Sequence, residues 1–314
     1  MIETHNLRRV FKSRKGAVEA VAGVDLDVKK GEIFGFLGPN GAGKTTTLRM
    51  LSTLLPITSG EATVAGFDLA HNAAKVRYEI GYVSQEGSSA PEIPGRTELV
   101  MQGRLYGMPK ARALQRAAEL IAALELADCA DRATKTYSGG QKRRLDIGIG
   151  LMHLPQLLFL DEPTTGLDPQ SRARMWDEVR KLRDTGTTVF LTTHYLEEAD
   201  ALCDRIAIID HGKIVALGTP DDLKRQVAGD VVVVGTDHAS DQVLALLKGQ
   251  SYVREATSAD GVVRLYVDRG ETAMPQIIRV LDSANIPLAT LSLSRPSLDD
   301  VFLHQTGRSL RDAA

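Results

Sequence analysis

The sequence has few of the residues that mark disulfide-bonded or zinc-binding proteins. Its 314 residues include two cysteines, one tryptophan and only 5% aromatic residues in all. Cys129 and Cys203 are far apart in the chain and lack the spacing of metal ligands. We therefore expect two reduced thiols in a cytoplasmic protein, and neither a disulfide framework nor a zinc site.

The chain also lacks the patterns of a signal peptide and of a membrane-spanning helix. Residues 1–5 have neither a basic start nor an apolar stretch. The longest nearly apolar run, residues 147–160, is interrupted by His153 and Pro155. It is shorter than the roughly 20 residues that a spanning helix needs. We expect a protein that does not cross a membrane by itself and that works at one only if a partner holds it there.

An excess of charge of either sign is absent as well. Lys and Arg number 38 and Asp and Glu 40, which gives a formal net charge of -2. This balance gives no reason to expect a general affinity for nucleic acid. The densest basic run, residues 8–15, is more typical of a solvated face than of a nucleic-acid site. The length allows one large domain, or one large and one small domain.

The first 220 residues are predicted to form an α/β domain. Residues 1–7 and 17–28 predict strands, and Ile33–Leu37 is a continuous apolar run typical of a strand buried on both faces. Glycines follow this run, and residues 45–55 predict a helix. Later strands are expected at 157–160, 187–192 and 205–210, and helices at 171–184 and 196–202. This alternation predicts a mainly parallel sheet that is covered on both faces.

Two further regions depart from this alternation. From about Gly87 to Met152, apolar residues recur at helical spacing in residues 98–106, 110–124 and 141–152, which predicts a helical insertion. A turn cluster at residues 218–222 predicts a domain boundary. Residues 221–314 then predict a small α+β domain, with strands at 231–234 and 288–293, a strand pair within 252–267, and helices at 240–247, 272–284 and 298–304.

The segment from Gly38 to Thr45 fits the pattern of a phosphate-binding loop, Gly, four residues, then Gly-Lys-Ser/Thr. Glycines let backbone N–H groups turn toward a phosphate at the positive end of the following helix. Lys44 is expected to reach the β- and γ-phosphates of a nucleotide, and the Thr45 hydroxyl to bind Mg²⁺. The alternative is a glycine turn before a helix, but the strand before it and the helix after it favour nucleotide binding.

A pair of carboxylates follows the apolar strand at 157–160. Asp161 lies at the carboxyl end of that strand, next to the predicted phosphate loop, where it can hold Mg²⁺ directly or through water. Glu162 is then positioned to orient and deprotonate a water molecule aimed at the γ-phosphate. An apolar strand that ends in Asp-Glu is weak evidence alone, but its position after a phosphate loop makes it strong.

With Tyr137-Ser138-Gly139-Gly140-Gln141 between the loop and the strand, the sequence over roughly residues 1–220 resembles the ATP-binding cassette family. Ser-Gly-Gly-Gln separates this family from other phosphate-loop ATPases, and Tyr137 stands where Leu is common. The segment opens a helix whose N–H groups and hydroxyl can accept a second γ-phosphate. The alternative is a simple serine helix cap with flexible glycines. In the family that phosphate belongs to the nucleotide of the opposite subunit, so the resemblance implies a dimer.

The resemblance also assigns roles to single residues. Gln85 corresponds to the glutamine that touches Mg²⁺ and the attacking water, and His194 to the histidine that contacts the γ-phosphate. Asp168 corresponds to the loop that crosses the dimer interface. Phe11 corresponds to the aromatic residue that stacks on adenine, with a buried core position as the alternative. The implied nucleotide-binding residues are Phe11, Gly38, Pro39, Asn40, Gly41, Ala42, Gly43, Lys44, Thr45, Thr46, Ser138, Gly139, Gly140, Gln141 and Asp168; the metal ligands are Thr45, Gln85 and Asp161; the catalytic residues are Glu162, His194 and Gln85.

The closing segment, residues 295–308, resembles the C-terminal extension of the daunorubicin-resistance type of subunit. This implies the ATPase subunit of an exporter of a hydrophobic drug, antibiotic or lipid. It would act as a homodimer or heterodimer with Mg-ATP, at the cytoplasmic face of the cell membrane, beside a separate permease. The extension lacks clustered His, Cys or acidic residues, so a dimer-stabilising or regulatory role is expected.

Two other classes of protein are weighed against this interpretation. A soluble cassette ATPase that clamps ribosomes or DNA usually has two cassettes or a long coiled coil, whereas this chain has one cassette and no heptad run. A protein that confers resistance by sequestering a drug is expected to have an aromatic-rich pocket, and the composition gives no sign of one.

Overall fold

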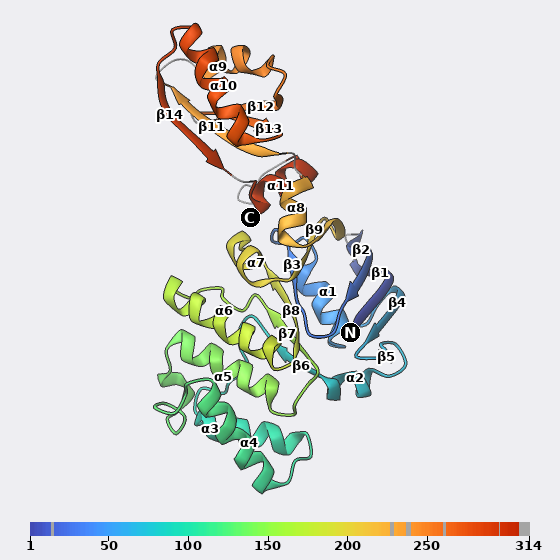
Figure 1. The fold of residues 1–314 in the computed structure, drawn as a ribbon. Helices are drawn as coiled ribbons and strands as arrows, with labels where there is room; N and C mark the ends of the chain where they lie inside the picture. Colours follow the sequence, from blue (N-terminus) through green and yellow to red (C-terminus); the bar gives the residue numbers. More distant parts are fainter. Residues whose placement is uncertain (14–15, 227–228, 237–239, 260–261, 295, 308–314) are drawn as a thin grey trace. The chain divides into compact units, whose positions relative to one another are not determined.

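The computed structural model of the chain describes residues 1–13, 16–226, 229–236, 240–259, 262–294 and 296–307 (Figure 1). The chain divides into two compact units, residues 1–217 and residues 218–312. Each unit has its own cluster of buried apolar side chains. In the described parts of the chain, no helix is both long enough and apolar enough to cross a bilayer.

The first unit begins with an antiparallel sheet in the order β2-β1-β4-β5. Its strands are β1 (Ile2–Ser13), β2 (Gly16–Val28), β4 (Ser59–Val64) and β5 (Phe67–Asp68). The first strand is longer than the predicted residues 1–7. It continues to Ser13 because its whole length pairs with β2, while its first half also pairs with β4.

The second sheet of this unit has six strands in the order β10-β9-β3-β8-β7-β6. Neighbouring strands from β9 to β6 run parallel, and β3, β7 and β8 are buried along their whole length. The predicted fold class, a phosphate-loop core with N-terminal antiparallel strands, is confirmed. The strands are β3 (Ile33–Leu37), β6 (Ile80–Val83), β7 (Leu157–Asp161), β8 (Thr188–Thr193), β9 (Arg205–Asp210) and β10 (Lys213–Gly218).

Helices flank this sheet, and those between β6 and β7 lie in the region where the helical insertion is predicted (Figure 1). The predicted helix at 45–55 is too long. The chain leaves the helix after Leu51, Thr53 adopts a positive φ of 65°, and the amides of the next two residues both donate to the Arg49 carbonyl. The helices of the first unit are α1 (Lys44–Leu51), α2 (Ala73–Glu79), α3 (Gly95–Leu105), α4 (Lys110–Ala123), η1 (Thr134–Thr136), α5 (Gly139–Leu151), α6 (Pro169–Asp184) and α7 (Leu196–Leu202).

The second unit is an antiparallel sheet in the order β12-β13-β11-β14, with α9 and α10 packed on it. Its first residues correct the predicted turn: Thr219 accepts a hydrogen bond from the Asp222 amide, which starts a helix at Pro220. The elements are α8 (Pro220–Gln226), β11 (Asp230–Thr236), α9 (Ser240–Lys248), β12 (Val253–Ala259), β13 (Val262–Val267), α10 (Gly270–Ser283), β14 (Leu288–Ser294) and α11 (Leu298–Thr306).

The parallel strands of the first unit place the predicted site residues along one edge of the sheet. Four strands, β3, β8, β7 and β6, are successive neighbours, and parallel strands end at the same edge. The phosphate loop follows β3, His194 follows β8, Glu162 follows β7, and Gln85 follows β6 by two residues. Residues that are far apart in the sequence are therefore brought side by side.

Candidate functional site

The loop from Gly38 to Thr45 has the conformation that a phosphate-binding loop needs. Gly43 has a φ of 106°, and a Cβ there would lie 2.5 Å from the Ala20 carbonyl oxygen. Only glycine is suited to both conditions. The Lys44 Nζ donates to the Gly38 and Pro39 carbonyls at 2.8 and 3.0 Å. The lysine thus lies along the loop, above the N-terminus of α1.

Asp161 is joined to this loop through hydroxyl groups. Its Oδ1 accepts hydrogen bonds from the Thr45 Oγ1 at 3.1 Å and from the Thr192 Oγ1 at 2.7 Å, and the side chain is 1% exposed. Magnesium takes one or two protein oxygens when substrate phosphates and water supply the other ligands. The carboxylate of Asp161 and the hydroxyl of Thr45 fit this requirement.

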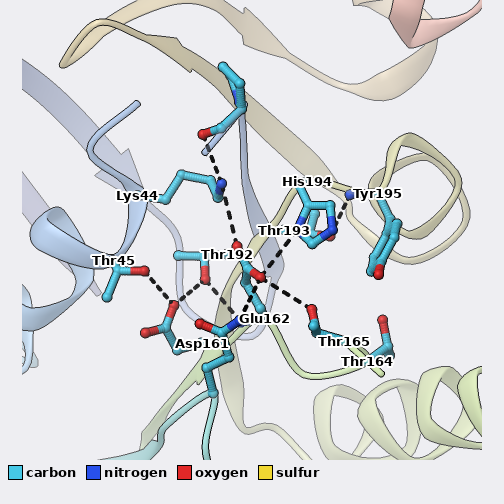
Figure 2. A network of polar contacts seen from close by, with 12 residues as sticks. Lys44, Thr45, Asp161, Glu162, Thr164, Thr165, Thr192, Thr193, His194 and Tyr195 are labelled. Atoms are coloured by element: carbon cyan, nitrogen blue, oxygen red, sulfur yellow. Dashed lines mark hydrogen bonds and ion pairs between the residues drawn. The ribbon is translucent and has the colours of Figure 1, made fainter. Parts of the chain in front are cut away.

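Glu162 is the centre of the polar network drawn in Figure 2. Its Oε1 lies 3.5 Å from the Lys44 Nζ. Its Oε2 lies 3.2 Å from the His194 Nδ1 and accepts hydrogen bonds of 3.2 Å from Gln85 and Thr165. The sequence-predicted residues Gln85, His194 and Lys44 are therefore gathered around one carboxylate.

The backbone of Glu162 explains how its side chain points into this cluster. Its φ is 45°, in the left-handed region that costs a residue other than glycine about 1–3 kcal/mol. Its amide donates to the carbonyl and to the hydroxyl of Thr192 on the neighbouring strand, at 3.2 and 3.1 Å. These bonds hold the chain in a sharp turn at the end of β7.

Glu162 and Lys44 each influence the pKa of the other. Burial raises the pKa of Glu162, but the His194 contact and the Lys44 charge outweigh burial and lower it overall. Burial lowers the pKa of Lys44, and the charge of Glu162 opposes this. Since the pKa of Glu162 lies below its usual value, its carboxylate is ionised at neutral pH, as a group that accepts a proton must be.

The Ser138-Gly139-Gly140 segment lies apart from this cluster. Ser138 accepts a hydrogen bond from the Gln141 amide and donates its own amide to the Gln141 side chain, which starts α5. Figure 1 shows α5 well separated from α1. Among the hydrogen bonds and ion pairs of the described residues, none joins residues 138–140 to Lys44 or Glu162.

Asp168 also lies outside the cluster. Its carboxylate accepts hydrogen bonds from the amide and hydroxyl of Ser171 at 2.9 and 2.6 Å, which caps α6 and lowers its pKa. Gly140 faces the same serine, because a Cβ on Gly140 would lie 3.3 Å from the Ser171 Oγ. Asp168 and the start of α5 therefore share one surface of the chain.

Phe11 is 40% exposed, so the alternative of a core phenylalanine is wrong. It lies on β1 opposite Val18 of β2, and the Arg9 guanidinium lies 4.7 Å from its ring centroid. Ala20 is two residues beyond Val18, and its carbonyl group packs against Gly43 of the phosphate loop. The hairpin therefore carries an exposed ring on β1, while its other strand, β2, contacts the predicted phosphate loop.

Sequence reasoning missed two hydroxyl groups of the site and one buried charge. Thr192 bonds to Asp161, and Thr165 bonds to Glu162. Arg143, 7% exposed, donates to the carbonyls of Asp161 and Pro163 at 2.9 and 2.8 Å. The position of Thr192 near the end of a buried strand was a signal that its hydroxyl has a buried partner. The sequence did not show which strand lies next to it.

Family models match both units of the chain. A model described as ABC transporter matches residues 21–165. A second model, described as the C-terminal domain of ATP-binding proteins similar to DrrA1-3, matches residues 218–306.

Comparisons with single proteins agree with these models. The chain is 44% identical over 306 residues to the daunorubicin resistance ATP-binding protein DrrA3 of Streptomyces coeruleorubidus, covering 96% of each chain. It is 38% identical to the linearmycin resistance ATP-binding protein LnrL of Bacillus subtilis (strain 168), covering 99% of this chain and 100% of LnrL. A dimeric ATP-binding cassette in a post-hydrolysis state with ADP and Pi has a TM-score of 0.65 and 25% identity, covering 70% of this chain and 98% of that one.

Proposed function

The chain belongs to the ATP-binding cassette transporter family, and we propose that it is the ATPase subunit of an exporter of hydrophobic drugs or antibiotics. The single observation that carries this proposal is the gathering of Lys44, Gln85 and His194 around the carboxylate of Glu162. The relatives DrrA3 and LnrL are named for resistance to two different antibiotics. They support the class of cargo without identifying the molecule.

We infer that the nucleotide site is completed by a second subunit. The N-terminus of α5 offers to an anion the Ser138 hydroxyl and the amides of Gly139 and Gly140, which make no hydrogen bond among the described residues. Within one chain, no hydrogen bond or ion pair among the described residues joins this end to Lys44. A cassette related to this chain forms a dimer with bound ADP and Pi. In our proposal, Ser138 of one subunit binds the γ-phosphate that Lys44 of the other subunit holds.

The residues of one site then divide the work of hydrolysis. Lys44 and the loop amides hold the phosphates, and Thr45 and Asp161 hold magnesium. The bound ion would neutralise charge that develops on the phosphates. Glu162 accepts the proton of the attacking water, Gln85 positions that water beside the carboxylate it contacts, and His194 fixes the position of the carboxylate. Closure of the dimer around two nucleotides drives a conformational change in a separate permease. Hydrolysis of the nucleotides then reopens the dimer.

The helical insertion offers a surface for the permease. A groove of about 390 Å³ lies beside α3 and is lined by Tyr82 and Ser88, on either side of Gln85, and by Leu105. Leu105, Met101 and Leu54 line this groove and are 79%, 48% and 57% exposed, so together they form an exposed apolar patch of the kind that marks interaction sites. A permease segment in this groove would lie next to the Gln85 segment. In this proposal the permease holds the chain at the cytoplasmic face of the membrane.

A test of the proposed function pairs the full chain with a candidate permease, taken from the membrane proteins that neighbouring genes encode. In vesicles that hold both, we expect ATP-dependent uptake of an anthracycline and faster ATP hydrolysis than by the chain alone. Leu105→Asp should abolish most of that acceleration, because it places a charge in the apolar groove. Leu114→Asp serves as the control, because Leu114 is also exposed but lies on α4 outside the groove. Absence of ATP hydrolysis under both conditions would contradict the proposal.

The role of Phe11 can be tested separately. Phe11→Ala is expected to weaken ATP binding about threefold to tenfold, because aromatic stacking contributes about 0.5–1.5 kcal/mol. The rate at saturating ATP should change little, since Glu162 and its neighbours are untouched. Binding of a fluorescent ATP analogue measures the affinity. Phe67→Ala is the matched control, because Phe67 also carries a cation over its ring but lies on β5. Equal ATP affinity of wild type and Phe11→Ala would remove Phe11 from the site.

A further inference from the structure

The helix that begins at Ser138 carries a buried arginine whose role the proposed chemistry does not use. Arg143 is 7% exposed, and each nitrogen of its guanidinium donates to a backbone carbonyl. Nε bonds to Pro163 at 2.8 Å, Nη1 to Ser84 at 2.5 Å and Nη2 to Asp161 at 2.9 Å. A buried charge is costly unless it is fully hydrogen-bonded, so this site is built for a guanidinium.

The three carbonyls belong to neighbours of the residues that act on the nucleotide. Ser84 directly precedes Gln85, and Pro163 directly follows Glu162. Asp161 supplies its carbonyl to Arg143 and its carboxylate to Thr45. Arg143 therefore binds the backbone of two segments, the one that contains Gln85 and the one that contains Glu162.

A second buried charge lies one turn further along the same helix. Asp146 is 2% exposed, and its Oδ1 accepts hydrogen bonds from the amides of Ser88 and Ser89 at 2.9 and 3.1 Å. Gly87 permits this approach, because its φ is 80° and a Cβ there would lie 2.6 Å from the Asp146 Oδ2. Helix α5 also packs against β6, the strand that leads to Gln85.

Together the two charges hold both ends of the short segment that contains Gln85. Arg143 binds the residue before Gln85, and Asp146 binds the amides three and four residues after it. Both belong to α5, whose first turn offers Ser138 to the nucleotide of the other subunit. A displacement of α5 must therefore move the Gln85 segment, unless these buried bonds break.

We propose that Arg143 and Asp146 are positioning residues that lock the Gln85 segment to the helix of Ser138. Each chain contributes Ser138 to the nucleotide site of its partner and Gln85 to its own nucleotide site. The bonds of Arg143 and Asp146 therefore couple the two sites of the dimer. This inference rests on the proposed dimeric function. The inference predicts that the hydrogen bonds of Arg143 and Asp146 in one chain affect both sites, because they hold Ser138 of one site and Gln85 of the other.

Mixed dimers of the full chain test this prediction. Two copies with different tags are co-expressed and purified by both tags, and one copy carries Glu162→Gln, so that only one site hydrolyses ATP. That active site uses Glu162 and Gln85 of the unmodified copy and Ser138 of the Glu162→Gln copy. Arg143→Lys is then introduced into one copy or the other, and phosphate release is measured at saturating Mg-ATP.

We expect Arg143→Lys to slow the active site about tenfold from either copy, since the single ammonium nitrogen of a lysine cannot reach the three carbonyls that Arg143 contacts through three separate nitrogens. A residue that only shaped its own catalytic centre would act from the unmodified copy alone. A residue that only held Ser138 would act from the Glu162→Gln copy alone. Either of these one-sided results, or no loss from either copy, would overturn the proposed link.

Two further variants separate this role from a general effect on folding. Arg144→Lys is the matched control, because Arg144 is next in the same helix and donates to Leu124 and Glu125 instead. It should change neither site. Asp146→Asn keeps the shape of the side chain and should reproduce the two-sided loss at about threefold, because neutral hydrogen bonds are weaker than charged ones. A wild-type chain that does not hydrolyse ATP would instead remove the proposed function, and this inference with it.

Discussion

Replacing Glu162 by glutamine is expected to lower the rate of ATP hydrolysis by about 10²–10⁴-fold, the usual contribution of a general base. ATP binding should persist, because Lys44, Thr45 and the phosphate loop are unchanged. The substitution also removes the carboxylate that lies 3.5 Å from the Lys44 Nζ, so the lysine is freer to bind phosphate. Since the nucleotide remains intact, we expect a dimer that stays closed. Phosphate release, ATP affinity and light scattering with Mg-ATP measure these three effects.

A second buried glutamate provides the control for this experiment. Glu178 on α6 is 7% exposed and pairs with Lys181 at 2.8 Å, outside the cluster around Glu162. Glu178→Gln makes the same chemical change and should leave hydrolysis near the wild-type rate. If Glu162→Gln also hydrolysed ATP at that rate, another group would have to accept the proton of the attacking water.

The strands and the phosphate loop could be predicted from the sequence because their patterns are local. The strand Ile33–Leu37 and the helix Leu196–Leu202 are found with the predicted bounds. The segment from residue 56 to residue 86 gave no such pattern. Its strand β4 is only partly buried, and it forms because β1 offers an edge to pair with. Such pairing depends on residues that are distant in the sequence.

The site was predictable as far as a motif names its residues. Gln85 and His194 were placed by resemblance, and the structure brings both within 3.2 Å of Glu162. Thr192 was missed because its partner, Asp161, lies opposite it only in the parallel pairing of β7 with β8. The order of strands in a sheet cannot be derived from their separate patterns.

Arg143 and Arg144 show the same limit within one helix. They are consecutive and chemically identical in the sequence, yet the first is buried beside the catalytic segments and the second lies nearer the surface. Helical periodicity would assign both arginines to a polar face, since an arginine is seldom buried without partners. The partners of Arg143 are backbone carbonyls, which leave no mark in the sequence.

If two subunits share each site, the activity of a doubly substituted dimer depends on which copy carries each substitution. In a mixed dimer, Ser138→Arg and Glu162→Gln can be placed in the same copy or in opposite copies. If Ser138 completes the partner's site, the same-copy dimer has lost both sites, one through each substitution. The opposite-copy dimer retains one site, which uses Glu162 from the Ser138→Arg copy and Ser138 from the Glu162→Gln copy.

A chain with a self-contained site would give the reverse result. The same-copy dimer would keep its unmodified subunit active, and the opposite-copy dimer would be inactive. We expect phosphate release from the opposite-copy dimer to exceed that from the same-copy dimer by about 10²-fold or more, the usual effect of losing a donor to a developing charge. The Ser138→Ala pair repeats the comparison without the added bulk of arginine. Because the two dimers contain the same substitutions in the same number, differences in folding or expression cannot produce this contrast, and only the assignment of Ser138 to one site or the other can.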